Sequence, residues 1–465
     1  MTGRDTGSSP SCAGCPDAVH QAGCIFTDNQ FLALAIRSPL NDFSEFGLVI
    51  SDCKDAMRSH VSVLSTRVHC EAGGEKTEEE INMKLKLFNK PAVKTIKSED
   101  GDIIDCVDIY KQPAFDHPAL KNHTLQMRPS SDVLTETSTT AKNKTYEVVQ
   151  AFQTWQKSGT CPNGTIPIRR IHREDLLRAA SLDQFGRKYP NSRNQTATQD
   201  PNAHLGKKAV SVVSLPNRSS AVLFAYAYNF IGASGDINVW NPHVQAQGEY
   251  TTAQIWAKAG PGDTFESVEA GWVVHPALFG DTRTRLFAYW TVDGYRNTGC
   301  FDLTCTGFVQ TSSEIALGLA IEPISSFQYQ TVINVYMFLD VTTGSWWLHV
   351  NNKPVGYWPG KLFSFLTYSA IAVEWGGDVY SQNVRKTPHT MTAMGSGYAA
   401  EELFGLACFI NNVRIVDFSK SPKYPNPVNV FADEYRCYSA INYIEGNGVE
   451  PVFFFGGPGQ TYTCP

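Results

Sequence analysis

The chain has 465 residues, with 45 acidic and 39 basic side chains and a formal net charge of −6. This balance excludes the strongly basic surface of a nucleic-acid-binding protein. No apolar run approaches the roughly 18 residues that a membrane helix needs, so we expect neither nucleic acid nor a membrane as a partner. Charged residues make up 18% of the chain and aromatic residues 12%, a composition that suits β-structure better than helix bundles.

Residues 1–76 show no sustained helical or strand periodicity. Cys12 and Cys15 have the spacing of half a zinc site, with Cys24 nearby, but no second half follows. We therefore predict an atypical, poorly ordered N-terminal extension rather than a metal site. This segment also lacks the basic start and apolar core of a signal peptide, so the chain as written shows none.

Residues 77–205 predict a small mixed α+β domain that ends in a linker. Thr77 and Glu80 have the spacing of a capping box, and the apolar residues after them follow a helical period up to Pro91. The pattern over 173–185 predicts a second helix, because acidic residues stand at its start, where the helix dipole favours them. The later segments, in chain order, are extended stretches at 103–115 and 161–171, a helix at 173–185 and an exposed linker at 189–208.

From residue 206 the pattern changes to short apolar runs separated by turns. Eight of the nine tryptophans follow residue 205, as expected for a large aromatic core. The runs include 267–275, where the side chains alternate between two faces, and 313–321. Many such runs without a long helix predict an all-β sandwich or barrel over 206–465.

The search for catalytic motifs leaves carboxylates as the candidates. Motifs for a nucleophilic serine, a phosphate-binding loop and a zinc protease are absent. Glu269 interrupts one apolar strand, and Asp378 follows Trp375-Gly-Gly in another, with Glu374 on the same nominal face. A glycine beside each carboxylate leaves room for a backbone or a substrate to approach. His275 shares the face of Glu269, but a lone strand histidine is most often structural.

Twelve cysteines and five Asn-x-Ser/Thr sequons favour an oxidising, secretory environment. Cys300 and Cys305 enclose four residues, a length that a disulfide across a tight loop allows. The five sequons are at Asn122, Asn143, Asn163, Asn194 and Asn217.

Several long motifs resemble the plant neprosin family of glutamic peptidases. Residues 91–130 and 161–170 resemble the activation peptide of the same family. The resemblance runs from about residue 77 to the C-terminus, whereas residues 1–70 match nothing in it. The motifs of the β domain are 268–310, which begins VEAGW, then 346–360, WGGDVYS at 375–381, HTMTAMGSG at 389–397 and FFFGGPGQ at 454–460.

The resemblance implies a two-sheet antiparallel β-sandwich over 206–465, made as a zymogen whose propeptide and linker are residues 77–205. It implies cleavage of a peptide or protein substrate after proline at acidic pH, without a cofactor or metal, and inhibition by the chain's own propeptide. The protein would be secreted or vacuolar, and we expect a monomer. The cysteine pattern of the family implies three disulfides and a buried free thiol: Cys106–Cys161, Cys300–Cys305, Cys437–Cys464 and Cys408.

By the same resemblance, the catalytic residues are Glu269 and Asp378. Asp378 stands where the family has a second glutamate, and a carboxyl retracted by roughly an ångström can cost about 100-fold in rate. Two facing carboxyls cannot easily both ionise and therefore share one proton. Acidic pH is needed because this singly protonated pair is the active form. We expect both carboxyls on one sheet, in an open cleft and close enough to share a water.

Two other functions stay open from the sequence. Asp378 favours a catalytically silent β-sandwich that binds peptide or carbohydrate, whereas the intact motif around Glu269 favours the enzyme. A structural cell-wall protein is disfavoured because the chain has no repeats and no proline-rich tracts.

Overall fold

The computed structural model describes residues 76–130, 147–188, 215–446 and 448–465. Contacts divide the chain into two units, residues 1–75 and 76–465, and only the second contains described residues. Residues 1–75 of the predicted extension and the predicted linker at 189–208 lie outside the described residues. Within the described residues, no helix combines the length and the apolar character that crossing a bilayer requires.

The helix predicted after Thr77 is confirmed as α3 (Glu78–Phe88). The Thr77 hydroxyl accepts a hydrogen bond from the Glu80 amide at 3.2 Å, and the Glu80 carboxylate accepts one from the Thr77 amide at 3.0 Å. This reciprocal pair satisfies two amides that the first helical turn leaves without partners. Ile81 is fully buried, so the helix is held by packing as well as by its cap.

The helix predicted over 173–185 is shorter than expected, because α4 (Arg173–Arg178) ends at Arg178. Ala179 is extended, with φ of −61° and ψ of 146°. The Ser181 hydroxyl then accepts a hydrogen bond from the Gln184 amide at 3.2 Å, which closes a turn instead of another helical turn.

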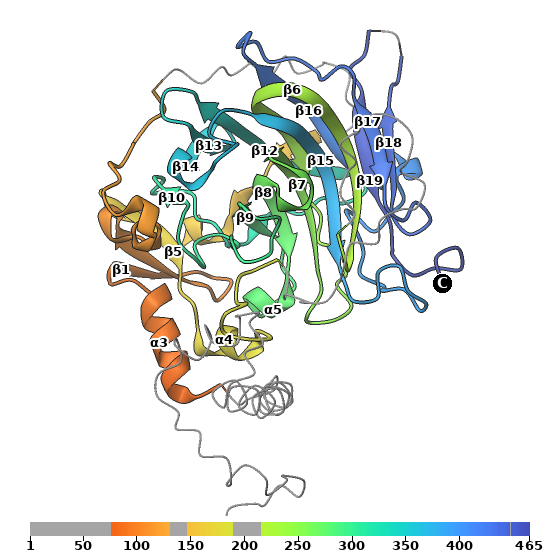
Figure 1. Cartoon of the computed structure of the whole chain (residues 1–465). Helices are drawn as coiled ribbons and strands as arrows, with labels where there is room; N and C mark the ends of the chain where they lie inside the picture. The colour runs from red at the N-terminus through yellow and green to blue at the C-terminus, as the bar shows by residue number, and fades with distance from the viewer. Residues whose placement is uncertain (1–75, 131–146, 189–214, 447) are drawn as a thin grey trace, which may run out of the picture. The chain divides into compact units, whose positions relative to one another are not determined.

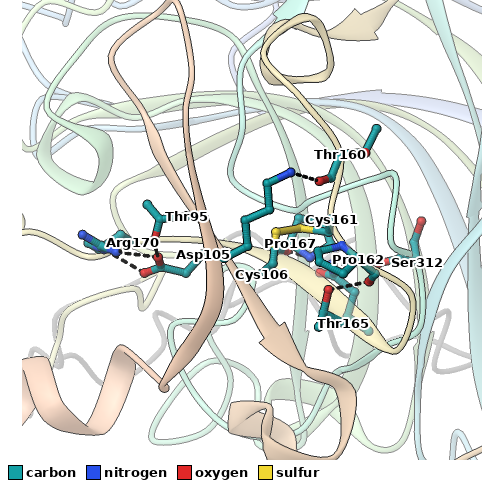
Figure 2. The surroundings of a disulfide bond; sticks show 12 residues. Thr95, Asp105, Cys106, Thr160, Cys161, Pro162, Thr165, Pro167, Arg170 and Ser312 are labelled. Carbon is teal, nitrogen blue, oxygen red and sulfur yellow. Dashed lines mark hydrogen bonds and ion pairs between the residues drawn. A yellow bond between two sulfur atoms is a disulfide. The ribbon is translucent and has the colours of Figure 1, made fainter.

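The two predicted extended segments contribute strands to a three-stranded antiparallel sheet, in the order β1 (Ala92–Lys97), β2 (Ile103–Asp108) and β5 (Thr165–Arg169). The Cys106–Cys161 disulfide lies beside this sheet, as Figure 2 shows. Asp105 accepts hydrogen bonds from Thr95 at 2.8 Å and from Arg170 at 2.7 Å, which ties the three strands together. The short elements of this region are η3 (Ile109–Lys111), η4 (Pro113–Asp116), η5 (Pro118–Leu120), β3 (Glu147–Gln150), β4 (Phe152–Gln153) and η6 (Thr154–Lys157).

The all-β prediction for the rest of the chain is confirmed, since nearly all of its strands belong to one large, mostly antiparallel, curled sheet (Figure 1), and the short strand β11 pairs with β4 instead. The strands along this sheet are β10 (Val309–Gln310), β14 (Lys353–Trp358), β13 (Ser345–Val350), β12 (Tyr329–Asp340), β6 (Arg218–Asn238), β15 (Ala370–Tyr380), β7 (Tyr250–Ala259), β8 (Glu266–Val274) and β9 (Arg285–Thr291). Further strands are β11 (Ile321–Glu322), β16 (Cys408–Asp417), β17 (Asn429–Ala432), β18 (Ser439–Tyr443) and β19 (Val452–Gly456). Short helices are η7 (Gly262–Thr264), α5 (Pro276–Phe279), η8 (Gly360–Leu362) and η9 (Ala400–Glu402).

The long strand β6 joins the two expected sheets into one array. Its first half pairs with β15 and β17, and its second half pairs with β12 and β16. The curled sheet encloses one aromatic core, to which β8 contributes Trp272 and β13 contributes Trp346 and Trp347. Burial of such large rings is the main stabilising term of a sandwich core.

The strand predicted over 313–321 is wrong, apart from its last residue, which begins β11. Gln153 pairs with the backbone of Ala316 instead: its Oε1 accepts from the amide at 2.9 Å, and its Nε2 donates to the carbonyl at 2.5 Å. Gly318 then turns the chain with φ of +78°, a conformation that favours glycine. A side chain from a distant segment therefore takes the place of a neighbouring strand, which periodicity alone does not reveal.

The N-terminal domain, residues 76–188, shares hydrogen bonds and core with the β domain, residues 215–465. β3 pairs in parallel with the start of β12, and β4 pairs with β11. Ala114 and Leu120 belong to the large aromatic core. The two domains are therefore built as one packed unit.

Gly271 on β8 is required by the close approach of β7. A Cβ there would lie 2.0 Å from the Ala253 carbonyl oxygen and 2.6 Å from the Cα of Gln254. We predict that Gly271→Ala lowers the free energy of unfolding by about 3 kcal/mol, the upper end of the usual cost of overpacking, because the two strands must separate. Gly248→Ala is the matched control, since nothing lies within 4 Å of that position. Urea unfolding of both variants checks this, and equal stabilities would contradict it.

Candidate active site

Glu269 and Asp378 lie on one sheet and point to the same face. The strands β8 and β15 lie on either side of β7 (Figure 1). Glu269 on β8 pairs with Trp256 of β7, and Asp378 on β15 pairs with Thr252 of β7. Trp256 and Thr252 are an even number of residues apart on β7, so their partners share a face. The two carboxylates are therefore separated by one strand and by four positions along it.

Three neutral donors surround the Glu269 carboxylate. Ser267 donates to Oε1 at 2.6 Å, Gln254 donates to Oε2 at 2.7 Å, and the Tyr295 hydroxyl also donates to Oε1. Burial raises the pKa of Tyr295 well above its ordinary value, so this hydroxyl keeps its proton. These donors hold the carboxylate in one orientation on the sheet.

Lys188, from the end of the N-terminal domain, forms an ion pair with Glu269, and neither side chain has any exposed surface. Its amide donates to the Tyr289 hydroxyl, and its carbonyl accepts from the Tyr250 hydroxyl, both at 3.2 Å. The ammonium lies within 4.9–5.8 Å of four ring centroids, a range in which cation–π attraction is favourable. The rings are those of Phe287, Tyr289, Tyr295 and Phe301.

The expectation of an open cleft is wrong for this form of the protein. Glu269 and Asp378 are both fully buried, and Lys188 lies directly on Glu269. Lys188 was not among the predicted site residues, since it directly precedes the predicted linker and carries no local signal. Ser267 and Gln254 could have been found, because they lie beside Glu269 by strand alternation and pairing.

Asp378 has a cation of its own. Arg218, the first residue of β6, forms an ion pair with Oδ2, and the Ser220 hydroxyl donates to Oδ1 at 3.1 Å. The Arg218 and Asp378 side chains are 4% and 0% exposed. The two carboxylates thus bind different cations, one from each domain.

The charges change the pKa values of the Lys188–Glu269 pair. Burial alone would raise the pKa of Glu269, but the nearby Lys188 and Arg218 outweigh it and lower the pKa to about 2. Burial lowers the pKa of Lys188 to about 8, and the attraction of Glu269 opposes this shift. Both groups are therefore charged at neutral pH.

The other sequence candidates lie outside this arrangement. Glu374 shares the face, but its carboxylate binds Lys258 at 2.6 Å. His275 packs against Tyr250 and is neutral, because burial lowers its pKa to about 3, as expected of a structural histidine.

The cysteine predictions are confirmed. The three disulfides form as expected, and Cys408 is a buried free thiol. His389 lies within 4.8 Å of the sulfur atoms of Cys437 and Cys464. These sulfurs are bonded to each other, so this group is not a metal site.

Two family models match the chain. The neprosin activation peptide matches residues 95–213, and neprosin matches residues 247–458. The chain therefore belongs to the neprosin family, and the N-terminal domain that supplies Lys188 is part of an activation peptide.

Three solved structures are similar to part of the chain at low sequence identity. Scytalido-glutamic peptidase with a peptide-based transition state analog is 10% identical, covers 52% of this chain and 98% of that chain, and has a TM-score of 0.29. SCP-B of the Eqolisin family, in complex with the tripeptide Ala-Ile-His, is 9% identical, with coverages of 52% and 98% and a TM-score of 0.28. The β-porphyranase BpGH16B from the human gut bacterium Bacteroides plebeius is 7% identical, with coverages of 34% and 54% and a TM-score of 0.21.

Loss of the Lys188 ammonium leaves Glu269 buried without its main partner. The pKa of Glu269 is lowered from its ordinary value of 4.5 to about 2, so the ion pair stabilises the fold fully at pH values above 4.5. This stabilisation is lost as the pH falls from 4.5 toward 2. We predict that Lys188→Met destabilises the full chain by about 3–5 kcal/mol at pH 7. The loss should be smaller at pH 4, where the unpaired carboxyl takes up a proton.

Urea unfolding of the full chain at the two pH values measures this difference. The matched control is Lys157→Met, which removes the exposed partner of Glu322 and should change stability little at either pH. An equal loss for Lys188→Met at both pH values would contradict the assignment.

Proposed function

We propose that this chain is the zymogen of an acid-acting glutamic endopeptidase that cleaves after proline through Glu269 and Asp378. The observation that carries the proposal is the burial of Lys188, a residue of the activation peptide, on Glu269. A propeptide cation on a carboxylate both blocks the site and fixes its charge. Departure of the propeptide would free this carboxylate for chemistry.

The acid requirement follows from the charges on the site. Without Lys188, burial favours the neutral form of Glu269, so its pKa rises from the low value of the full chain. In mild acid, one carboxyl of the pair is protonated and the other is ionised. The ionised carboxyl activates a water, and the protonated one stabilises the developing oxyanion, so no cofactor or metal is needed.

The rings around Lys188 support a preference for proline. Phe287, Tyr289, Tyr295 and Phe301 lie beside the carboxylate that we assign to catalysis. Once the lysine leaves, these flat apolar surfaces are available to a proline ring of a peptide or protein substrate.

We further propose that the protein is a secreted or vacuolar glycoprotein and a monomer. Its three disulfides require an oxidising compartment during folding. The sequon residues Asn122 and Asn163 are exposed and accessible to glycosylation.

Glu269→Gln should abolish cleavage of a proline-containing peptide at acidic pH, with a loss of at least about 100-fold in rate. The amide keeps the shape of the side chain but cannot exchange a proton. Initial rates after acid activation measure this effect. Glu314→Gln, on an exposed carboxylate that binds Lys353, is the control and should keep full activity.

Asp378→Asn should also abolish cleavage, whereas Asp378→Glu should raise the rate by up to about 100-fold, because it restores the reach that the family uses. Both variants are compared with wild type on the same peptide. If the wild-type rate equals that of Glu269→Gln and Asp378→Glu gains nothing, the protein is a peptide- or carbohydrate-binding module instead.

A further inference from the structure

Arg218 remains beside Asp378 when the propeptide departs. It is the first residue of β6, within the β domain, and its guanidinium centre lies 5.1 Å from the Tyr295 ring. Lys188, in contrast, belongs to the activation peptide. Activation therefore removes the cation from Glu269 and leaves the cation on Asp378.

This difference makes the two carboxylates unequal in the mature protein. A guanidinium does not lose its proton in a protein, so its charge is present at every working pH. Next to it, an ionised Asp378 remains paired with the guanidinium and hydrogen-bonded to the Ser220 hydroxyl. Among the described residues, Glu269 keeps the neutral donors Ser267, Gln254 and Tyr295 as direct partners.

We propose that Arg218 is a positioning residue that keeps Asp378 ionised in the mature enzyme, which makes Asp378 the general base and Glu269 the general acid. This inference rests on the proposed peptidase function and assigns the two roles within it. In this arrangement the two carboxyls do not share one proton equally: Glu269 carries the proton and Asp378 carries the negative charge.

The reaction then proceeds in balanced steps. Asp378 takes a proton from water as the water oxygen bonds to the scissile carbonyl carbon, and Glu269 gives its proton to the carbonyl oxygen. When the C–N bond breaks, the proton on Asp378 moves to the leaving nitrogen, and the hydroxyl of the intermediate returns its proton to Glu269. Both carboxyls regain their starting states.

The groups around Asp378 define the expected pH dependence. Arg218 and the Ser220 hydroxyl contact it from β6, and Lys188 acts on it only before activation. Burial raises the pKa of Tyr438 well above its ordinary value, and the charges of Glu434, Glu249 and Asp378 raise it further. The Tyr438 phenol is therefore neutral. The Asp433 carboxylate accepts a hydrogen bond from the Ser220 amide at 3.0 Å. Arg218 is thus the cation that stays with Asp378.

The first test is the pH profile of kcat/KM for the activated enzyme. In Arg218→Gln, Asp378 loses the cation that favours its ionised form, so the low-pH limb should move up by at least about one pH unit, a tenfold loss on that limb. Arg218→Lys keeps the charge and should hold the limb near its wild-type position. If Arg218→Gln leaves the limb in place, or Arg218→Lys moves it equally, the proposal is overturned.

The second test needs no activity and no variant of Arg218. Aspartate labelled with 13C at the carboxyl reports the ionisation of Asp378 in the activated wild-type protein, with Asp378→Asn identifying the signal. We expect the chemical shift of an ionised carboxylate at the acidic pH at which the activated protein cleaves peptides. A protonated Asp378 at that pH would overturn the role of Arg218. An ionised Asp378 in a protein without peptidase activity would instead overturn the proposed function alone.

Discussion

Lys188 and Glu269 meet in a place that water does not reach, and each charge is tolerated there only because the other is present. Removing one member of such a pair costs several kcal/mol, since the remaining charge is left without compensation. The position of the propeptide and the protonation of Glu269 are therefore linked. Any condition that neutralises the carboxylate also weakens the hold on the segment that covers it.

The rest of the zymogen is arranged so that this segment stays in place. The Lys188 backbone is held by the hydroxyls of Tyr250 and Tyr289, on β7 and β9, which flank the strand of Glu269. Further along the propeptide, Gln153 binds the Ala316 backbone, and Asp102 forms a buried ion pair with Arg285 at 2.6 Å. Release of the propeptide therefore requires that several buried polar contacts break together.

Much of the fold could be predicted from the sequence, because alternating apolar residues and tryptophans determine which face of each strand is buried. Glu269 was singled out because it interrupts an otherwise apolar strand, and the resemblance to the neprosin family then implied its catalytic role. The partner itself could not be found: Lys188 is about 80 residues away along the chain, and no local pattern marks it. The same limit explains the error at 313–321, where Gln153, from another segment, satisfies the backbone that the pattern assigned to a strand.

The pairing of β3 with β12 has a consequence for the mature protein. Along Tyr329 to Val332, the hydrogen bonds on one side of β12 are made by the propeptide. When β3 leaves, this stretch becomes a free sheet edge with unpaired amides and carbonyls, which can template pairing with another chain. The edge is only four residue pairs long, and such short edges limit self-association. Loss of β3 thus exchanges a strand pairing within the chain for a short sheet edge that is available to other chains.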